Sequence, residues 1–405
     1  MLDLKPCPKY AKDTGIRVVP PEQTLARVLP LLDAAGLGQP EDITSKDDVG
    51  IPVFSVDRQE TALGIPKYYN GKGVTKEQAE ASAVMESIER YSAEMRDSDE
   101  VVFGTYEQAK DVMAAVNPAD LILPIWALDN LPGAEIAWTP GWEMFRGEPI
   151  WVPACEAFYP YKPDTDLQLY KFHTNGIAAG NTMEEAVLHA TFELIERDAW
   201  SIAEYRNDPV PDVVVDPDSV PGQLLERFGT HGIEVHLKDL TSDVGVPTIG
   251  AAADDVGTKD PEMLTIGVGT HLNPEIAAIR AITEVAQSRA THKDGKKINA
   301  QIQRATREMG YERIKAVNRL WYTDSKRRTR LSDMGDASTD DVLDDIEVVF
   351  GRLVDAGFDS VIAVDLTRPE LQVPVVRMVI PGMEVWTMDG DREGSRLKGM
   401  WPSGH

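Results

Sequence analysis

A helical segment that occurs three times constrains this chain more than any other feature of its sequence. Residues 71–90 (GKGVTKEQAEASAVMESIER) align without a gap on residues 178–197 (AAGNTMEEAVLHATFELIER), and a fainter copy follows later in the chain. Each copy begins at a residue that caps helices well, namely Thr75, Thr182 or Asn273, and continues with alanines at helical spacing. We therefore expect one type of helix, with its cap and its acidic end, to be used three times.

The repeated helices carry their charged residues on one face. Residues three and four positions apart share a helical face, so Glu86, Glu89 and Arg90 project together. Ser82 lies one turn earlier. The matching residues of the later copies are Glu185, His189, Glu193, Glu196 and Arg197 in the second, and Arg280, Glu284 and Gln287 in the third.

Several carboxylates on inward-leaning faces are unfavourable unless a cation holds them. Magnesium takes carboxylate, water and phosphate oxygens as ligands, and arginine pairs with phosphate. We therefore expect the three helices to converge on one magnesium–nucleotide site. The third copy has Gln287 in place of the second acid and carries Arg280, so the first two helices are expected to bind metal and the third nucleotide.

Three other interpretations compete with this one. A single E-x-x-E-R segment is most often a solvated helix face with ion pairs, but the ungapped recurrence argues against that here. A di-iron carboxylate bundle would show E-x-x-H motifs, and neither E-x-x-E pair continues into one. Zinc hydrolysis is disfavoured because the chain has 7 His, 2 Cys and no H-E-x-x-H motif.

The surroundings of the helices predict a mixed α/β (α+β) fold. Strand-like runs such as residues 51–58, 246–254 and 373–380 alternate with amphipathic helices, and no low-complexity linker separates autonomous domains. Residues 293–341 are charged and helical with little apolar continuity, which predicts an exposed excursion.

Composition excludes several classes of function. The net charge of -26 argues against nucleic acid as the main partner, because phosphate binding needs a basic surface. The sequence lacks a signal-peptide pattern and an apolar run long enough to cross a membrane. With Cys7 and Cys155 as its only cysteines, the chain has no disulfide framework, and we expect a cytoplasmic protein with buried free thiols.

The motifs resemble those of the YcaO family, ATP-dependent enzymes that activate peptide backbone amides. The resemblance rests on S-x-x-x-E-x-x-E-R from Ser82, on N-x-x-x-E-x₇-E-x-x-E-R from Asn181 and on R-x-x-x-E-x-x-Q from Arg280. An early R-x₆-T pair, Arg17 and Thr24, matches the family's N-terminal nucleotide contacts. The sequence around these motifs is most similar to that of the archaeal branch called methanogenesis marker protein 1.

This resemblance implies a set of site residues and a division of the chain. Residues 1–60 would form an N-terminal segment with a nucleotide-contacting helix, and residues 61–405 a YcaO-like catalytic domain of pseudo-repeated subdomains. ATP would be bound by Arg17, Thr24, Ser82, Glu86, Asn181, Arg197, Arg280, Glu284 and Gln287. Magnesium would be held by Glu86, Glu89, Glu185, Glu193 and Glu196. Secondary candidates are Lys72, as a helix-entry residue or a phosphate contact, Arg90, and His189, which we expect to position a carboxylate.

The resemblance also implies a reaction. Family members transfer the γ-phosphoryl group of ATP to an amide oxygen, and with sulfide as nucleophile the product is a thioamide. For the archaeal branch the implied substrate is a glycine in the α subunit of methyl-coenzyme M reductase, with a TfuA-type sulfur-delivery partner and a homodimeric enzyme. An azoline- or amidine-forming cyclodehydratase and a non-catalytic ATP-binding scaffold are the alternatives. Azoline-forming relatives commonly end in a proline-rich tail, whereas this sequence ends in GMWPSGH.

Overall fold

The computed structural model describes most of the chain. The described residues are 2–11, 15–58, 67–162, 166–295 and 300–399. The boundary expected between residues 60 and 61, and residues 400–405 of the C-terminus, lie outside them.

The sequence repeat is a structural repeat of strand, turn and helix. In each unit three residues separate the end of the strand from the start of the helix. The three units are β3 (Tyr68–Lys72) with α2 (Lys76–Ser92), β7 (Ile177–Ala179) with α6 (Met183–Arg206), and β11 (Ile266–Thr270) with α8 (Pro274–Asp294). Thr75, Thr182 and Asn273 cap the helices as predicted, because each side chain accepts a hydrogen bond from a main-chain N–H of the first turn.

The three units close into a ring. Helix α2 packs on its own strand β3 and also on β7 of the second unit. Helix α6 packs on β7 and on β11 of the third unit, and α8 packs on β11 and back on β3. Each helix is therefore shared between its own unit and the next, which directs the three repeated faces towards a common centre.

Close approach between strand and helix explains the glycines and alanines of the repeat. A Cβ atom at Gly71 would lie 2.0 Å from the main-chain nitrogen of Ala83, and one at Gly267 would lie 2.4 Å from the main-chain oxygen of Ala281. Both alanines are fully buried. Any larger residue at these positions would push the helix, and its acidic face, away from the centre.

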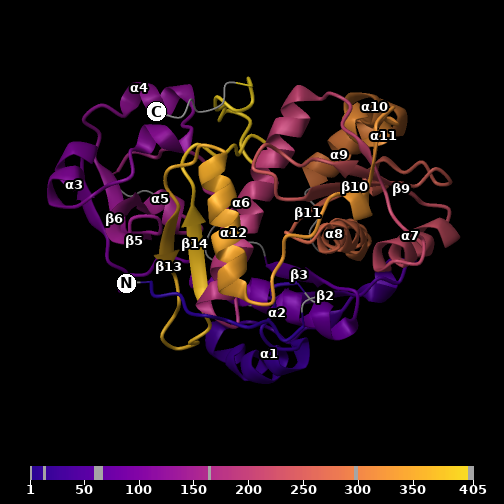
Figure 1. The fold of residues 1–405 in the computed structure, drawn as a ribbon, viewed down its shortest axis with the longest axis horizontal. Coiled ribbons are helices and arrows are strands. Elements are labelled where there is room, and N and C mark those ends of the chain that lie inside the picture. The colour runs from indigo at the N-terminus through magenta and orange to yellow at the C-terminus, as the bar shows by residue number, and fades with distance from the viewer. Residues whose placement is uncertain (1, 12–14, 59–66, 163–165, 296–299, 400–405) are drawn as a thin grey trace.

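The strands form three sheets among the described residues. One contains β1 (Glu41–Asp42), β2 (Val53–Asp57) and β3. The second has the order β11, β10 (Thr248–Asp254), β9 (Glu234–Asp239), β8 (Asp212–Val214) and β12 (Arg328–Arg330). The third has the order β4 (Val102–Gly104), β5 (Ile136–Glu143), β13 (Ile362–Asp365), β14 (Val375–Val379) and β7, with β6 (Glu148–Pro153) paired to β5. In Figure 1, α6 lies between the β13–β14 sheet on one side and the β10–β11 sheet on the other.

The remaining helices surround these sheets. They are α1 (Pro21–Val28), α3 (Tyr106–Val112), α4 (Ile125–Asn130), α5 (Ala154–Ala157), α7 (Val220–Thr230), α9 (Ala300–Met309), α10 (Tyr311–Val317), α11 (Arg319–Tyr322) and α12 (Val342–Asp355). Short 3₁₀ turns are Leu29–Leu31, Asp33–Ala35, Thr44–Lys46, Pro118–Leu121, Pro261–Met263 and Leu331–Asp333. In the part of the chain that the structure describes, no helix combines the length and apolar character that a membrane crossing requires.

The segment 293–341 is only partly the exposed excursion that its composition predicts. Helix α9 is mostly exposed, as expected. Trp321 of α11 is buried, lies edge-on against Trp200 of α6 and donates a hydrogen bond to Glu204 at 2.9 Å. Strand β12 extends the five-stranded sheet. The charged composition does not predict these contacts, because a few buried residues, among them Trp321, and the three paired residues of β12 make them.

Candidate nucleotide and metal site

The acidic face of α2 contains one arginine between two glutamates. The Arg90 guanidinium lies 2.6 Å from Glu89 and 3.8 Å from Glu86, so the three side chains project together as predicted. Arg90 also interacts electrostatically with Glu193 of α6. The first two repeats therefore meet at these residues.

The acidic face of α6 is central to the site. Arg197 lies 4.0 Å from Glu196 and interacts electrostatically with Glu193 and with Glu284 of α8. Glu196 in turn interacts with Glu284 and Arg280. The convergence of the three helices, which the sequence predicts, is thus present in the structure, although the ligand roles of the residues stay predictions.

Polar contacts near the acidic faces join the third unit to the others. Lys72, at the end of β3, forms an ion pair of 3.1 Å with Glu284. Nε2 of His189 lies 3.4 Å from a guanidinium nitrogen of Arg280. The polar contact that His189 makes is with a cation, and the expectation that His189 positions a carboxylate stays a prediction. Burial, and then Arg280, lower the pKa of His189, which keeps the ring neutral beside that cation.

The N-terminal segment joins the second repeat at a separate set of contacts. Glu185 is fully buried and accepts hydrogen bonds from the main-chain N–H of Val18 at 2.6 Å and of Asn181 at 2.7 Å, with Arg17 at 3.6 Å. Thr24 donates a hydrogen bond to the Asn181 side chain at 3.0 Å. The structure therefore brings the early R-x₆-T pair to the start of α6, and its role as a nucleotide contact stays a prediction.

Other predicted contacts lie on the same faces. Ser82 of α2 and Gln287 of α8 are half-buried on the helix surfaces that carry the glutamates. The two cysteines are buried free thiols, as predicted.

Burial is the largest influence on the pKa values of the central glutamates. Burial raises the pKa of Glu89 to about 8 and that of Glu196 to about 7, even though Arg90 and Arg197 oppose the two shifts. Burial also raises the pKa of Glu193 against the same arginines. Burial would raise the pKa of Glu284 as well, but Lys72 and Arg197 outweigh it and lower that pKa. A divalent cation would shift the raised values back, because it stabilises the ionised carboxylates.

Several buried polar atoms of the site have no hydrogen-bond partner. One carboxylate oxygen of Glu196 and the Nε atoms of Arg197 and Arg280 are buried without a hydrogen-bond partner. Buried polar groups of this kind usually have a partner. The residues present therefore fit a ligand that accepts from guanidinium groups and a cation that binds carboxylate oxygens, which is the chemistry of a magnesium–nucleotide pair.

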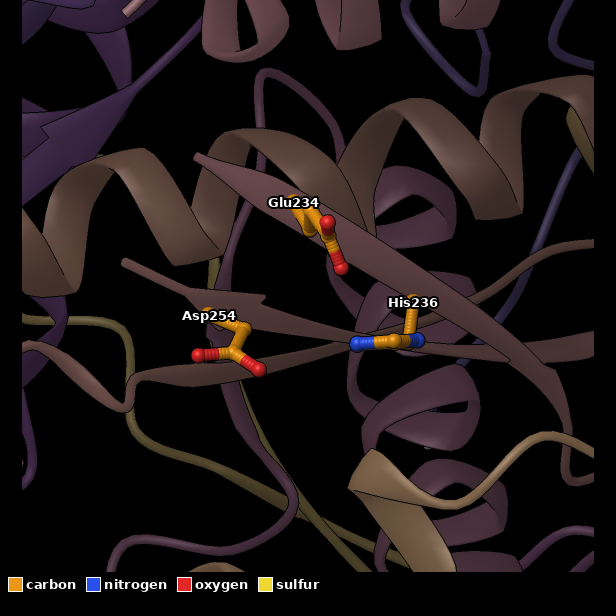
Figure 2. A group of neighbouring side chains, drawn as sticks. All are labelled: Glu234, His236 and Asp254. Carbon is orange, nitrogen blue, oxygen red and sulfur yellow. The ribbon is translucent and has the colours of Figure 1, made fainter. Parts of the chain in front are cut away.

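A tighter group of potential metal ligands lies elsewhere. Among the described residues, only Glu234 and His236 of β9 with Asp254 of β10 have ligand atoms that all lie within 4.8 Å of one another (Figure 2). Asp254 already accepts hydrogen bonds from Tyr311 and Lys315. Because a lysine ammonium and a tyrosine hydroxyl already pair with the Asp254 carboxylate, we assign no metal to this group.

Sequence reasoning missed one charged residue next to the site. Arg377 of β14 is 1% exposed and interacts electrostatically with Glu193. Its signal in the sequence was an arginine within the apolar run VPVVRMVI, where a charged side chain needs a buried partner.

Comparisons with known proteins agree with this geometry. A family model described as "YcaO cyclodehydratase, ATP- and Mg2+-binding" matches residues 70–384, which include all three helices. A protein of Methanothermobacter thermautotrophicus is 42% identical over 386 residues, covering 94% of this chain and 98% of its own. A protein encoded in the tfuA 3' region of Rhizobium leguminosarum bv. trifolii is 30% identical over 395 residues, covering 95% of this chain and 92% of its own.

Solved structures show the same fold. The YcaO protein from Methanopyrus kandleri, bound with AMPPCP and Mg2+, matches with a TM-score of 0.80 and 30% identity over 96% of this chain and 98% of that one. A heterocyclase in complex with substrate and cofactor has a TM-score of 0.82 at 24% identity, covering 95% of this chain and 54% of that one, which shows the shared fold alone. Together, the matched family model, the archaeal and bacterial relatives and the three-unit ring show that this chain belongs to the YcaO family, whose members bind ATP and Mg2+.

Proposed function

We propose that the protein uses ATP and Mg2+ to activate a peptide backbone amide, and that sulfide converts this amide into a thioamide. Sulfide would add to the amide carbon, the γ-phosphoryl group would pass to the amide oxygen, and phosphate would leave with that oxygen. The observation that carries the proposal is the convergence of five glutamates from α2, α6 and α8, where one carboxylate oxygen of Glu196 and the Nε atoms of Arg197 and Arg280 are buried without a hydrogen-bond partner.

The proposed roles follow from position and charge. Glu86, Glu89, Glu193 and Glu196, with Glu185 at the N-terminal end, would hold magnesium, which neutralises phosphate charge when it is bound. The nucleotide contacts would be Arg17, Thr24, Ser82, Asn181, Arg197, Arg280, Glu284 and Gln287, with Lys72 and Arg90 nearby. The arginines provide fixed N–H donors where phosphate charge develops, in a buried environment where such contacts are strong.

The genomic position of one relative supports the choice of sulfide, because the family resemblance implies a TfuA-type partner that delivers sulfur. The archaeal relative aligns over almost the whole of both chains, and the bacterial relative is encoded beside tfuA. We propose a glycine in the α subunit of methyl-coenzyme M reductase as the substrate, a TfuA-type partner for sulfur delivery, and a homodimeric enzyme. The second candidate is azoline or amidine formation, which the similarity to a heterocyclase fold favours.

The mass of the product separates these reactions. We expect a glycine-containing peptide incubated with enzyme, ATP, Mg2+ and sulfide to gain the mass difference between sulfur and oxygen. Loss of one water from a peptide that contains Cys, Ser or Thr would instead identify azoline formation. An unchanged peptide under conditions where ATP is bound would contradict the thioamide proposal, and an absence of ATP hydrolysis with any amide would favour the non-catalytic scaffold.

A matched pair of variants on α2 tests the site. Glu86→Gln removes a proposed metal ligand, and we expect it to abolish ATP turnover. Glu77→Gln changes an exposed glutamate in the first turn of the same helix, and we expect it to leave turnover unchanged. Equal activity of the two variants would contradict the assignment of Glu86.

A further inference from the structure

A small cavity, lined mostly by buried residues, lies next to α6. Its volume is about 20 Å³, which exceeds the roughly 10–15 Å³ that one ordered water requires, so one small species fits. The polar part of its lining consists of Glu156, His173, Asn175 and Arg392. The apolar part includes Leu194 of α6, which directly follows Glu193.

The side chains around the cavity carry excess positive charge. Arg377 and Arg392 are 1% and 3% exposed, and among the described residues the one carboxylate in contact with either guanidinium is Glu156, 2.9 Å from Arg377. Burial would raise the pKa of Glu156, but Arg377 and His173 outweigh it and lower that pKa to about 2, so Glu156 is ionised. Burial lowers the pKa of His173 to about 3, so this ring is neutral. Arg377 also interacts electrostatically with Glu193, but Glu193 is shared with Arg90 and Arg197, and among the described residues Arg392 has no carboxylate in contact. Arg392 is therefore a buried cation without an anion of its own, and a buried unpaired charge is costly.

The same group has more hydrogen-bond donors than acceptors. Nδ1 of His173 lies 3.2 Å from a guanidinium nitrogen of Arg377, and Nε2 lies 3.1 Å from one of Arg392. A neutral imidazole accepts a hydrogen bond at one nitrogen only. In one of these two contacts, therefore, a donor N–H of the ring faces a donor N–H of an arginine, and no hydrogen bond forms. The Nε of Arg377 is also buried without a partner.

One unpaired acceptor indicates that the species bound in the cavity donates a hydrogen bond. Oδ1 of Asn175 is buried without a hydrogen-bond partner, and Asn175 is 1% exposed. The fitting species accepts from N–H groups, donates one hydrogen to an amide oxygen and carries one negative charge. A halide has no hydrogen to donate, and water has no charge. Hydrosulfide meets all three requirements, since a sulfur can accept from N–H groups and donate its S–H.

We propose that this cavity binds one hydrosulfide anion beside the acidic site. Two links connect the cavity to the site. Leu194, which lines the cavity, follows Glu193 on α6. Arg377, which pairs with the cavity residue Glu156, interacts electrostatically with Glu193. The charge and size of the occupant follow from the cavity itself, whereas its identity as the sulfur nucleophile rests on the proposed function.

Hydroselenide is a direct probe, because it has the charge and hydrogen of hydrosulfide and scatters anomalously. Crystals of the full chain soaked anaerobically in hydroselenide should show one selenium peak in the cavity, within hydrogen-bond distance of Arg392 or His173. An ordered water alone would overturn the proposal. A selenium peak in a protein that makes no thioamide would instead retain the site and refute the proposed function.

Asparagine-to-aspartate substitutions supply the matched variants. Asn175→Asp places a permanent negative charge in the cavity, so we expect the selenium peak to disappear and the KM for sulfide to rise at least about tenfold with the KM for ATP unchanged. Asn117→Asp, at a cap where the side chain accepts from a main-chain N–H, should change neither quantity. Glu156→Gln removes the compensating anion and should give the peak at lower hydroselenide concentration. A peak unaffected by Asn175→Asp, or one lost in Glu156→Gln, would overturn the proposal.

Discussion

Replacing Glu89 by glutamine should make the ligand-free protein more stable while abolishing its ATP turnover. Glu89 is 9% exposed, and its pKa is raised from 4.5 to about 8 by burial, with a smaller contribution from Glu193. A carboxyl whose pKa is higher in the folded state binds more protons there than in the unfolded chain. Its contribution therefore becomes more destabilising as the pH rises from 4.5 to about 8.

The size of the effect follows from the shift. At 1.36 kcal/mol per pKa unit, the penalty reaches about 5 kcal/mol above both pKa values and is about 3 kcal/mol at pH 7. Below 4.5 the group is protonated in both states and the penalty vanishes. Glutamine keeps the shape and removes the charge. The gain is an upper limit, because Arg90 loses its partner at 2.6 Å and retains Glu86 at 3.8 Å.

Urea unfolding measures this difference directly. We expect the free energy of unfolding of Glu89→Gln, relative to wild type, to rise between about pH 5 and about pH 8 in the absence of metal. Glu77→Gln, on the exposed first turn of the same helix, should show no such rise. A Glu89→Gln difference that is independent of pH would refute the argument about burial. Wild-type ATP turnover in Glu89→Gln would refute the proposed metal role.

Two further substitutions test other contacts of the ring. Lys72→Met removes the 3.1 Å ion pair with Glu284, and we expect it to raise the KM for ATP. The free energy of unfolding should change by no more than about 1 kcal/mol, because both side chains are 22% exposed. An unchanged KM would place Lys72 outside the nucleotide site. Gly71→Ala would put a methyl group 2.0 Å from a main-chain nitrogen of α2, so we expect a loss of about 1–3 kcal/mol in thermal unfolding together with reduced ATP turnover. Gly351→Ala, on α12 with open space around it, should instead stabilise by up to about 1 kcal/mol, and similar outcomes for the two glycines would contradict the close-packing argument.

The local parts of the fold were predictable from the sequence. Thr75 and Asn273 cap their helices because a cap depends on a few neighbouring residues. The acidic faces were predictable for the same reason, since helical spacing alone places Glu86, Glu89 and Arg90 together.

Contacts between distant segments were harder to predict. The hydrogen bond from Val18 to Glu185 and the approach of His189 to Arg280 depend on how the units pack, which helical spacing does not specify. Arg377 was missed because its neighbours read as an ordinary buried strand. The convergence of the three helices was expected from the repeat and from the resemblance to the family, but the closed ring that produces it became visible only in the structure.

The closed ring affects how the protein unfolds and whether a fragment that lacks one of the three units can function. Each helix packs on the strand of the next unit, so each unit contacts both of the others. Removing any one unit therefore removes a packing contact from each of the remaining two. A ligand bound at the centre therefore stabilises all three units, and not only the residues that it contacts. Magnesium and nucleotide should then raise the melting temperature of all three units together, and a fragment lacking β11 and α8 should lose ATP binding even though α2 and α6 keep their glutamates.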